Sequence, residues 1–195
     1  MGIDTKGKLL DVAQQMMLAR GFAATSVDEI CQKAKLTKGC FFHYFKSKEE
    51  LARELLRRFC ASVKERTEEE MRPIEPDPLE RVYQRIDFAI QMSKERHRVK
   101  GCLLGTFAQE LSESHPKMRL LCAQAFEEWA LGFKGDLDLA KARHVPRASW
   151  KTRSLAEHFI AVLEGSQILA KAKEDAQIVE ESLEHFRRYV KWLFE

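Results

Sequence analysis

The stretch S-V-D-E-I-C-Q-K-A-K-L-T-K-G-C-F-F-H-Y-F, residues 26–45, decides the fold of this chain. Ser26 is followed three residues later by Glu29, which is a capping box that marks the start of a helix. Apolar residues at helical spacing extend this helix for about nine residues, up to a tight turn at 35–36. A short second helix is predicted over 37–45. Two helices joined by so short a turn have the spacing of a helix-turn-helix unit.

Further helices are predicted on both sides of this unit. Residues 5–20 carry apolar side chains at helical spacing, and Gly21 then supplies the glycine that commonly ends a helix. Ser47 opens a second capping box, from which a helix extends to about residue 71. Three prolines within 72–78 interrupt the pattern, which stays helical after this break. We therefore expect an all-α protein of about nine helices.

The composition of the 195-residue chain agrees with a helical globular protein. Hydrophobic residues make up 45% and charged residues 32%, so the chain can form a core and global disorder is excluded. Nine Gly and five Pro are too few for a many-stranded β fold. No run approaches the roughly 20 apolar residues that cross a bilayer, and residues 1–8 lack the apolar segment of a secretory signal. We expect a cytoplasmic protein with no membrane partner, whose five cysteines are free thiols.

The charge is distributed unevenly along the chain. Residues 1–64 carry twelve Lys and Arg against seven Asp and Glu, whereas the remainder carries 21 against 23. A basic head on a mildly acidic body is expected where one end of a protein meets a polyanion. A chance imbalance of surface charge would look the same, so the charge alone is a weak signal.

In a helix-turn-helix unit the second helix lies in the major groove of DNA, and its first side chains meet base edges. Lysine donates to guanine acceptors or phosphates, and a helix N-terminus also favours a phosphate. Lys48→Ala is therefore predicted to weaken binding to all DNA sequences and to lower the salt dependence of binding. We expect Thr37, Lys38, Gly39, Cys40 and His43 to approach bases, and Ser26, Tyr44, Lys46 and Lys48 to contact phosphates.

Residues 9–56 resemble the tetracycline-repressor (TetR) family of bacterial transcriptional regulators. The resemblance is carried by G-F-A-A-T-S-V-D-E-I at 21–30 and by T-K-G-C-F-F-H-Y-F-K-S-K-E-E-L at 37–51. It implies an all-α homodimer with an N-terminal three-helix DNA-binding domain at 1–48. The helix at about 47–71 would join this domain to a ligand-binding and dimerisation domain at 49–195.

The chain departs from the family pattern at three positions. Phe42 stands where the family usually has Tyr, so a phosphate-bonding hydroxyl is missing, although the ring can still press on a sugar or a thymine methyl group. Lys35 stands where Gly is frequent, and a left-handed conformation there would cost about 1 kcal/mol. Asp28 stands where some relatives carry a base-contacting Arg, so no such contact is expected.

The resemblance also implies how such a protein assembles and responds. Because the dimer presents two recognition helices, its operator should be a palindromic double-stranded DNA site. We expect a repressor that a small apolar or aromatic effector releases from this operator. The last two helices would form a four-helix bundle with the partner, through Leu155, Phe159, Leu163, Val179, Leu183, Phe186, Val190 and Leu193.

An effector pocket is predicted among the aromatic residues between Phe88 and Phe159. The segment 101–111, followed by H-P at 115–116, resembles a segment common in one branch of the family. Each of these residues could instead fill the core, so the pocket rests mainly on the resemblance. The predicted lining is Phe88, Met92, Leu103, Leu104, Phe107, Phe126, Trp129 and Phe133, with Gln109, Glu110 and Gln167 as candidate polar anchors.

Two alternative functions stay open beside this interpretation. Cys102 is a candidate sensor of oxidants or electrophiles, although an inert buried thiol is the simpler alternative. A helical enzyme or carrier whose head never reads DNA also stays open. No residue pattern selects a catalytic set, a metal site or a cofactor, so none is predicted.

Overall fold

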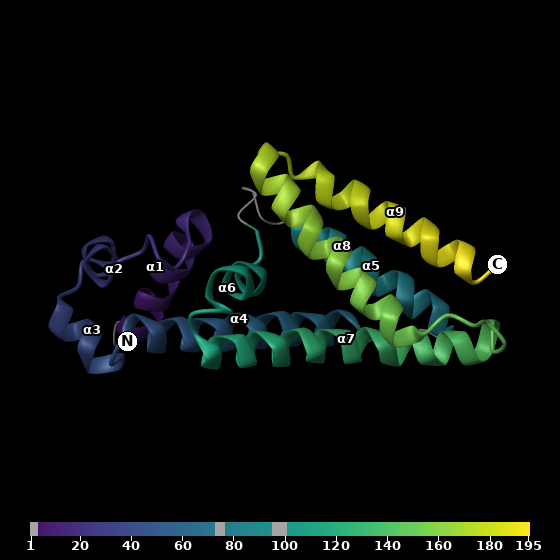
Figure 1. Ribbon diagram of the computed structural model, residues 1–195, viewed down its shortest axis with the longest axis horizontal. Helices are drawn as coiled ribbons and strands as arrows, with labels where there is room; N and C mark the ends of the chain where they lie inside the picture. Colours follow the sequence, from purple (N-terminus) through teal and green to yellow (C-terminus); the bar gives the residue numbers. More distant parts are fainter. Residues whose placement is uncertain (1–3, 73–76, 95–100) are drawn as a thin grey trace. The chain divides into compact units, whose positions relative to one another are not determined.

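The computed structural model describes residues 4–72, 77–94 and 101–195. Within these ranges it consists of nine α-helices and contains no strand, which confirms the expected all-α fold (Figure 1). Residues 73–76, in the predicted break at 72–78, lie outside the described residues. The helices are α1 (Thr5–Arg20), α2 (Val27–Ala34), α3 (Lys38–Tyr44), α4 (Lys48–Glu70), α5 (Pro78–Lys94), α6 (Leu103–Leu111), α7 (Pro116–His144), α8 (Thr152–Lys173) and α9 (Gln177–Leu193).

The described residues form two compact units. Unit 1 contains the chain up to Val63 together with Cys102–Ala123, and unit 2 contains the described parts of Lys64–Gly101 and Gln124–Glu195. The packing therefore differs from the expected division at residue 48. Residues 49–63 and α6 belong to the same unit as the N-terminal helices. Within this unit α6 lies against α1.

Unit 1 is built around aromatic and aliphatic side chains from α1 to α4 and from α6. Phe41 and Phe45 of the α3 segment are buried as predicted, and their ring centroids lie 5.6 Å apart. They secure the inner face of a seven-residue helix that is too short to be stable alone. Other fully buried members of this unit are Leu9, Ala13, Met17, Ile30, Leu51, Leu55 and Phe107.

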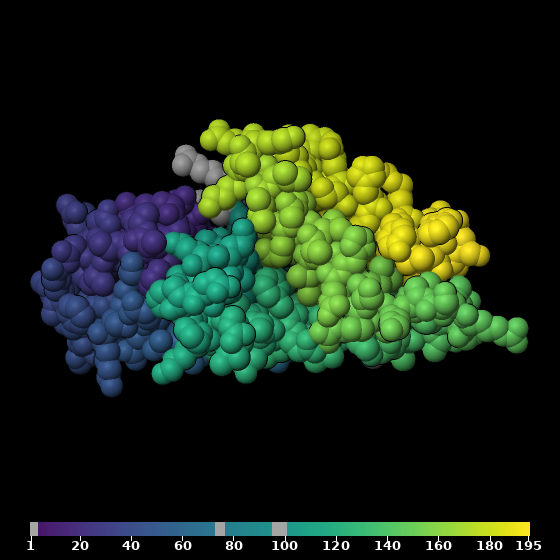
Figure 2. Space-filling view, in the orientation of Figure 1, coloured from purple at the N-terminus to yellow at the C-terminus, as the bar shows by residue number. Residues whose placement is uncertain are grey.

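Unit 2 centres on three aromatic rings that stack between α7, α8 and α9. The ring centroids of Phe133 and Phe159 lie 4.7 Å apart, and those of Phe159 and Phe186 lie 5.5 Å apart. In Figures 1 and 2, α8 and α9 run alongside one another as a hairpin, and α5 also packs against α9. At the edge of this core Asp136 is a buried carboxylate that accepts hydrogen bonds from two arginines of α5, which compensate its charge.

This core contains most of the side chains that were predicted to form the dimer interface. Six of the eight predicted side chains are buried inside the single chain, and Leu163 and Leu193 pack against the same core. The apolar stripes of α8 and α9 face α5 and α7 of their own chain. The role of these residues in a dimer interface stays a prediction.

Among the described residues, none of the helices combines the length and the apolar composition needed to span a bilayer.

Candidate nucleic-acid interface

The start of α2 is held by the capping box that the sequence predicted. The Ser26 hydroxyl accepts from the Glu29 N–H, while the Glu29 carboxylate accepts from both the N–H and the hydroxyl of Ser26. These hydrogen bonds, with the ion pair to Arg20, lower the pKa of Glu29 to about 2. Both donors of Ser26 are thus directed at Glu29. In this arrangement the Ser26 hydroxyl therefore has no free hydrogen to donate to the predicted phosphate.

The turn between α2 and α3 depends on a left-handed residue. Lys35 has φ 54° and ψ 46°, and its N–H donates to the carbonyls at the end of α2. The Leu36 N–H then donates to the Cys31 carbonyl at 2.9 Å. These hydrogen bonds satisfy carbonyls that a helix end otherwise leaves unpaired, and they set the direction in which the chain enters α3.

Helix α3 presents one buried face and one exposed face. Thr37 caps the helix, since its Oγ1 accepts from the Cys40 N–H at 3.1 Å. Phe41 and Phe45 point inward, whereas Phe42 is 54% exposed and Tyr44 is 38% exposed. An exposed phenylalanine beside other aromatic rings is unusual on a surface that contacts only water. The remaining predicted base-facing residues Thr37, Lys38, Gly39 and His43 are exposed, and Cys40 is half-buried.

The lysines of this surface are held in different ways. The Lys38 ammonium forms an exposed 2.7 Å ion pair with Asp28 of α2, so this pair must open before Lys38 can donate to DNA. Lys46 is exposed, and in the described part of the chain its ammonium has no acidic partner. Its backbone N–H donates to Glu50 at 2.7 Å. Lys46 is therefore more available to a phosphate than Lys38.

Lys48 has a role inside the protein that the sequence did not reveal. Its ammonium donates to the carbonyls of Phe22 and Thr25 at 3.0 and 2.9 Å. It also lies 4.1 Å from the centroid of the Phe22 ring, within the range of a cation–π interaction. Lys48 thus links the turn between α1 and α2 to the start of α4 by two hydrogen bonds. One N–H of its ammonium is left to donate to DNA.

Glu110 of α6 holds the same turn from the other side. Its carboxylate accepts from the N–H groups of Phe22 and Ala23, both at 2.7 Å. The sequence suggested Glu110 as a polar anchor for an effector, but both of its oxygens bind this backbone. No local sequence signal predicts this contact, because the partners are 88 and 87 residues apart.

The predicted effector-lining residues are divided between the two units. Leu103, Leu104 and Phe107 belong to unit 1, where they are buried. Phe126 and Trp129 of unit 2 are half-buried and stack edge to face at 6.0 Å, and Phe133 is in the core. Phe88 is buried and Met92 is half-buried, both in unit 2. Their role in binding an effector stays a prediction.

We predict opposite stability changes at the two left-handed positions that flank α2. Gly21 has φ 88° and ψ 171°, a region nearly exclusive to glycine, and an added Cβ would lie 2.8 Å from a Glu110 oxygen. Gly21→Ala should lower the free energy of unfolding by about 1–3 kcal/mol. Lys35→Gly should raise it by about 0.5–1 kcal/mol, because it removes left-handed strain from an exposed position.

Urea denaturation followed by circular dichroism measures both changes, with Lys33→Gly in the last turn of α2 as the control. That control should be destabilised, because its backbone is helical and gains nothing from glycine. A Gly21→Ala variant as stable as the parent would contradict the role of this turn.

The sequence and the fold were compared with those of known proteins. Residues 9–55 match the family described as bacterial regulatory proteins, tetR family, and residues 78–186 match the tetracyclin repressor-like C-terminal domain. The chain is similar to the HTH-type transcriptional repressor NemR of Escherichia coli K12, with 24% identity over 191 residues, which are 96% of this chain and 94% of that protein.

Solved structures share this fold. A TetR transcriptional regulator from Chloroflexus aurantiacus has a TM-score of 0.85 at 23% identity and covers 96% of this chain and 94% of its own. The structure described as the reduced form of E. coli NemR has a TM-score of 0.80 at 24% identity, over 95% and 96% of the two chains. Since the helix-turn-helix head and the helices that follow it both match, the chain belongs to the tetR family of bacterial regulatory proteins and is a DNA-binding regulator of transcription.

Proposed function

We propose that this protein is a homodimeric repressor that binds a palindromic operator and is released from it by a small apolar or aromatic effector. The outward face of α3 is the observation that carries this proposal. Phe41 and Phe45 anchor the helix, while Phe42 and Tyr44 stay exposed on its other side. A short, firmly held helix with exposed polar, basic and aromatic side chains fits the major groove.

The contacts to DNA divide between bases and phosphates. The hydroxyl of Thr37 still has its hydrogen to donate, and Gly39 lets the backbone come close to the base edges. Phe42 can press on a sugar or on a thymine methyl group. Lys46 and Tyr44 are the leading phosphate contacts, because the ammonium of Lys48 is largely engaged within the protein. The proposed base contacts are Thr37, Lys38, Gly39, Cys40 and His43.

The outer face of the α8–α9 hairpin is the proposed dimer interface. Ile168 and Leu169 of α8 are about half exposed, and on α9 Tyr189 and Trp192 are also exposed. Trp192 is 68% exposed, and its ring centroid lies 6.2 Å from that of Tyr189. Large apolar side chains gathered on one hairpin are typical of a surface that a partner covers. A two-fold dimer would then present two α3 helices to two half-sites.

The operator can be identified by selection from random double-stranded DNA, and its salt dependence then tests the phosphate contacts. We predict that Lys46→Ala weakens binding to all sequences and lowers the slope of log K against log salt concentration by about one. Lys48→Ala should also weaken binding, with a smaller change of slope, because its ammonium mainly holds the turn. Fluorescence anisotropy over a range of salt concentrations measures both.

Lys64→Ala is the matched control, since Lys64 lies further along α4 and is paired with Glu68. It should leave the slope unchanged. If Lys46→Ala behaves like this control, the proposed path of the phosphates past the start of α4 is wrong. If no sequence is enriched in the selection, the chain does not read DNA, and the alternative of a helical carrier gains support.

We predict that Trp192→Asp prevents dimerisation, because an unpaired carboxylate would be buried in the proposed interface. Light scattering after size-exclusion chromatography should give the mass of one chain, and affinity for the operator should fall sharply. Leu139→Asp is the control, since Leu139 of α7 is also exposed and apolar but lies off the α8–α9 hairpin. A dimer that survives Trp192→Asp at micromolar concentration would exclude this surface as the interface.

A second candidate is regulation through Cys102. Its thiol is buried at the N-cap of α6, whose positive end attracts negative charge. Cys122 is buried too, and burial raises the pKa of its thiol to about 11. One similar structure, that of E. coli NemR, is described as a reduced form.

Replacement of Cys102 by Ser separates the two candidates. If Cys102 is the sensor, iodoacetamide should alkylate its sulfur with loss of iodide and release the wild-type protein from its operator, whereas Cys102→Ser should stay bound. Cys40→Ser is the control, because Cys40 is half-buried on the proposed DNA surface and could itself react. Equal release of the wild type and of Cys102→Ser would dismiss Cys102 as the sensor.

A further inference from the structure

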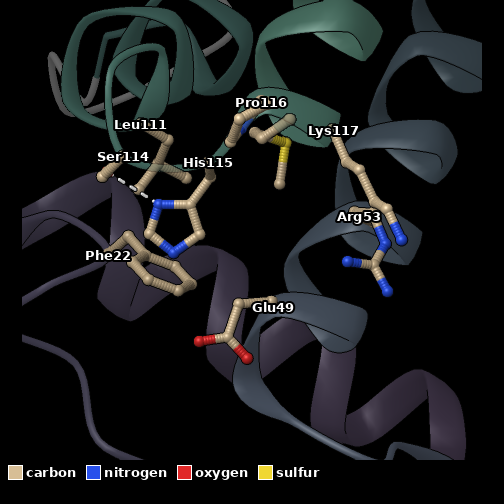
Figure 3. Close-up of a pocket in the computed structure, with 9 residues that line it drawn as sticks. Phe22, Glu49, Arg53, Leu111, Ser114, His115, Pro116 and Lys117 are labelled. Atoms are coloured by element: carbon tan, nitrogen blue, oxygen red, sulfur yellow. Dashed lines mark hydrogen bonds between the residues drawn. The ribbon is translucent and has the colours of Figure 1, made fainter.

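A pocket of about 340 Å³ lies within unit 1, between the start of α4 and the turn that joins α6 to α7 (Figure 3). None of the residues predicted to bind an effector lines it. It is therefore a separate cavity from the effector region suggested by the sequence. Its volume lies within the range of small-molecule sites in proteins.

The wall of this pocket is apolar and aromatic. Phe22, Leu111 and Met118 contribute buried side chains. The His115 ring lies next to the Phe22 ring in Figure 3, and the two stack edge to face with centroids 5.4 Å apart. Such a surface accommodates a flat apolar body, because aromatic rings pack well against one another in offset or edge-to-face arrangements.

Two cations border the same pocket. Arg53 extends from α4 and Lys117 from the first turn of α7, and Figure 3 shows both on one side of the pocket. Neither has an ion-pair partner among the described residues. By contrast, Arg57 and Arg58, further along α4, pair with Glu54 and Asp11. The pocket therefore has positive charge that the protein leaves uncompensated.

The other charges around the pocket also favour an anion. The first turn of α7 contains no acidic residue, so nothing in it offsets the positive end of this 29-residue helix. Glu49 is the only carboxylate among the lining residues. Hydrogen bonds from Ser47 and from its own backbone lower the pKa of Glu49, so it stays ionised at neutral pH. Two cations and one carboxylate leave one positive charge, which a ligand with a single negative charge would neutralise.

We propose that this pocket binds a small aromatic carboxylate, with its ring against Phe22 and Met118 and its carboxylate at Arg53 and Lys117. A planar guanidinium next to an ammonium suits a carboxylate, and the apolar wall removes the ring from water. The occupant would contact Phe22, whose backbone is held by Glu110 and Lys48. Such a ligand would therefore contact the turn that leads into α2.

The test measures binding of 1-naphthoate to the full-length dimer or monomer in the absence of DNA, by isothermal titration calorimetry. The wild type should bind one equivalent per chain. Arg53→Met and Lys117→Met should each weaken binding at least tenfold, because each removes a charge and keeps the aliphatic volume. The neutral analogue 1-naphthalenemethanol should also bind at least tenfold more weakly than 1-naphthoate.

Arg119→Met is the matched control, since Arg119 is an exposed cation two residues beyond Lys117 and does not line the pocket. It should change the dissociation constant by less than twofold. Thermal unfolding verifies that each variant is folded. No binding by the wild type at millimolar 1-naphthoate, or equal binding by the wild type and both pocket variants, would overturn the proposal. Because DNA is absent, either result leaves the proposed repressor function untouched.

Discussion

The DNA-binding unit depends on the hydrogen bonds that fix the turn between α1 and α2. Glu110 of α6 accepts from the N–H groups of Phe22 and Ala23, and Lys48 of α4 donates to the carbonyls of Phe22 and Thr25. A turn whose donors and acceptors are both bound by charged side chains cannot shift without breaking charge-assisted hydrogen bonds. Since α2 begins immediately after this turn, its orientation relative to α1, α4 and α6 follows from these contacts.

The same arrangement explains why α3 can be short and still present a defined surface. Phe41 and Phe45 bury one side of it, and the capped turn at Lys35 sets its direction. What remains outside is an exposed set of polar, basic and aromatic side chains that has no packing function in unit 1. This set forms the proposed DNA-binding surface, and its rigid support suits a fixed register on a groove.

In the C-terminal helices the amphipathic pattern accounts for the core but not for the exposed apolar side chains. The regular apolar stripe of α9, which includes Leu183 and Phe186, packs into the core of unit 2. The exposed Tyr189 and Trp192 fall outside this stripe, so helical periodicity does not select them. Periodicity identifies the face with the largest buried area, and within one chain that face belongs to its own core. The proposed dimer interface therefore uses side chains outside this stripe.

The sequence by itself determined the helices and their ends, because capping depends on residues only a few positions apart. The capping box at Ser26, the hydroxyl of Ser47 that caps α4 and the helix end at Gly21 are all of this kind. Only the tertiary structure decided the partners of Lys48 and Glu110, the exposed face of α9 and the pocket beside Arg53. These depend on contacts between segments tens of residues apart, whose side chains could equally well have faced solvent, and no local rule chooses among such contacts.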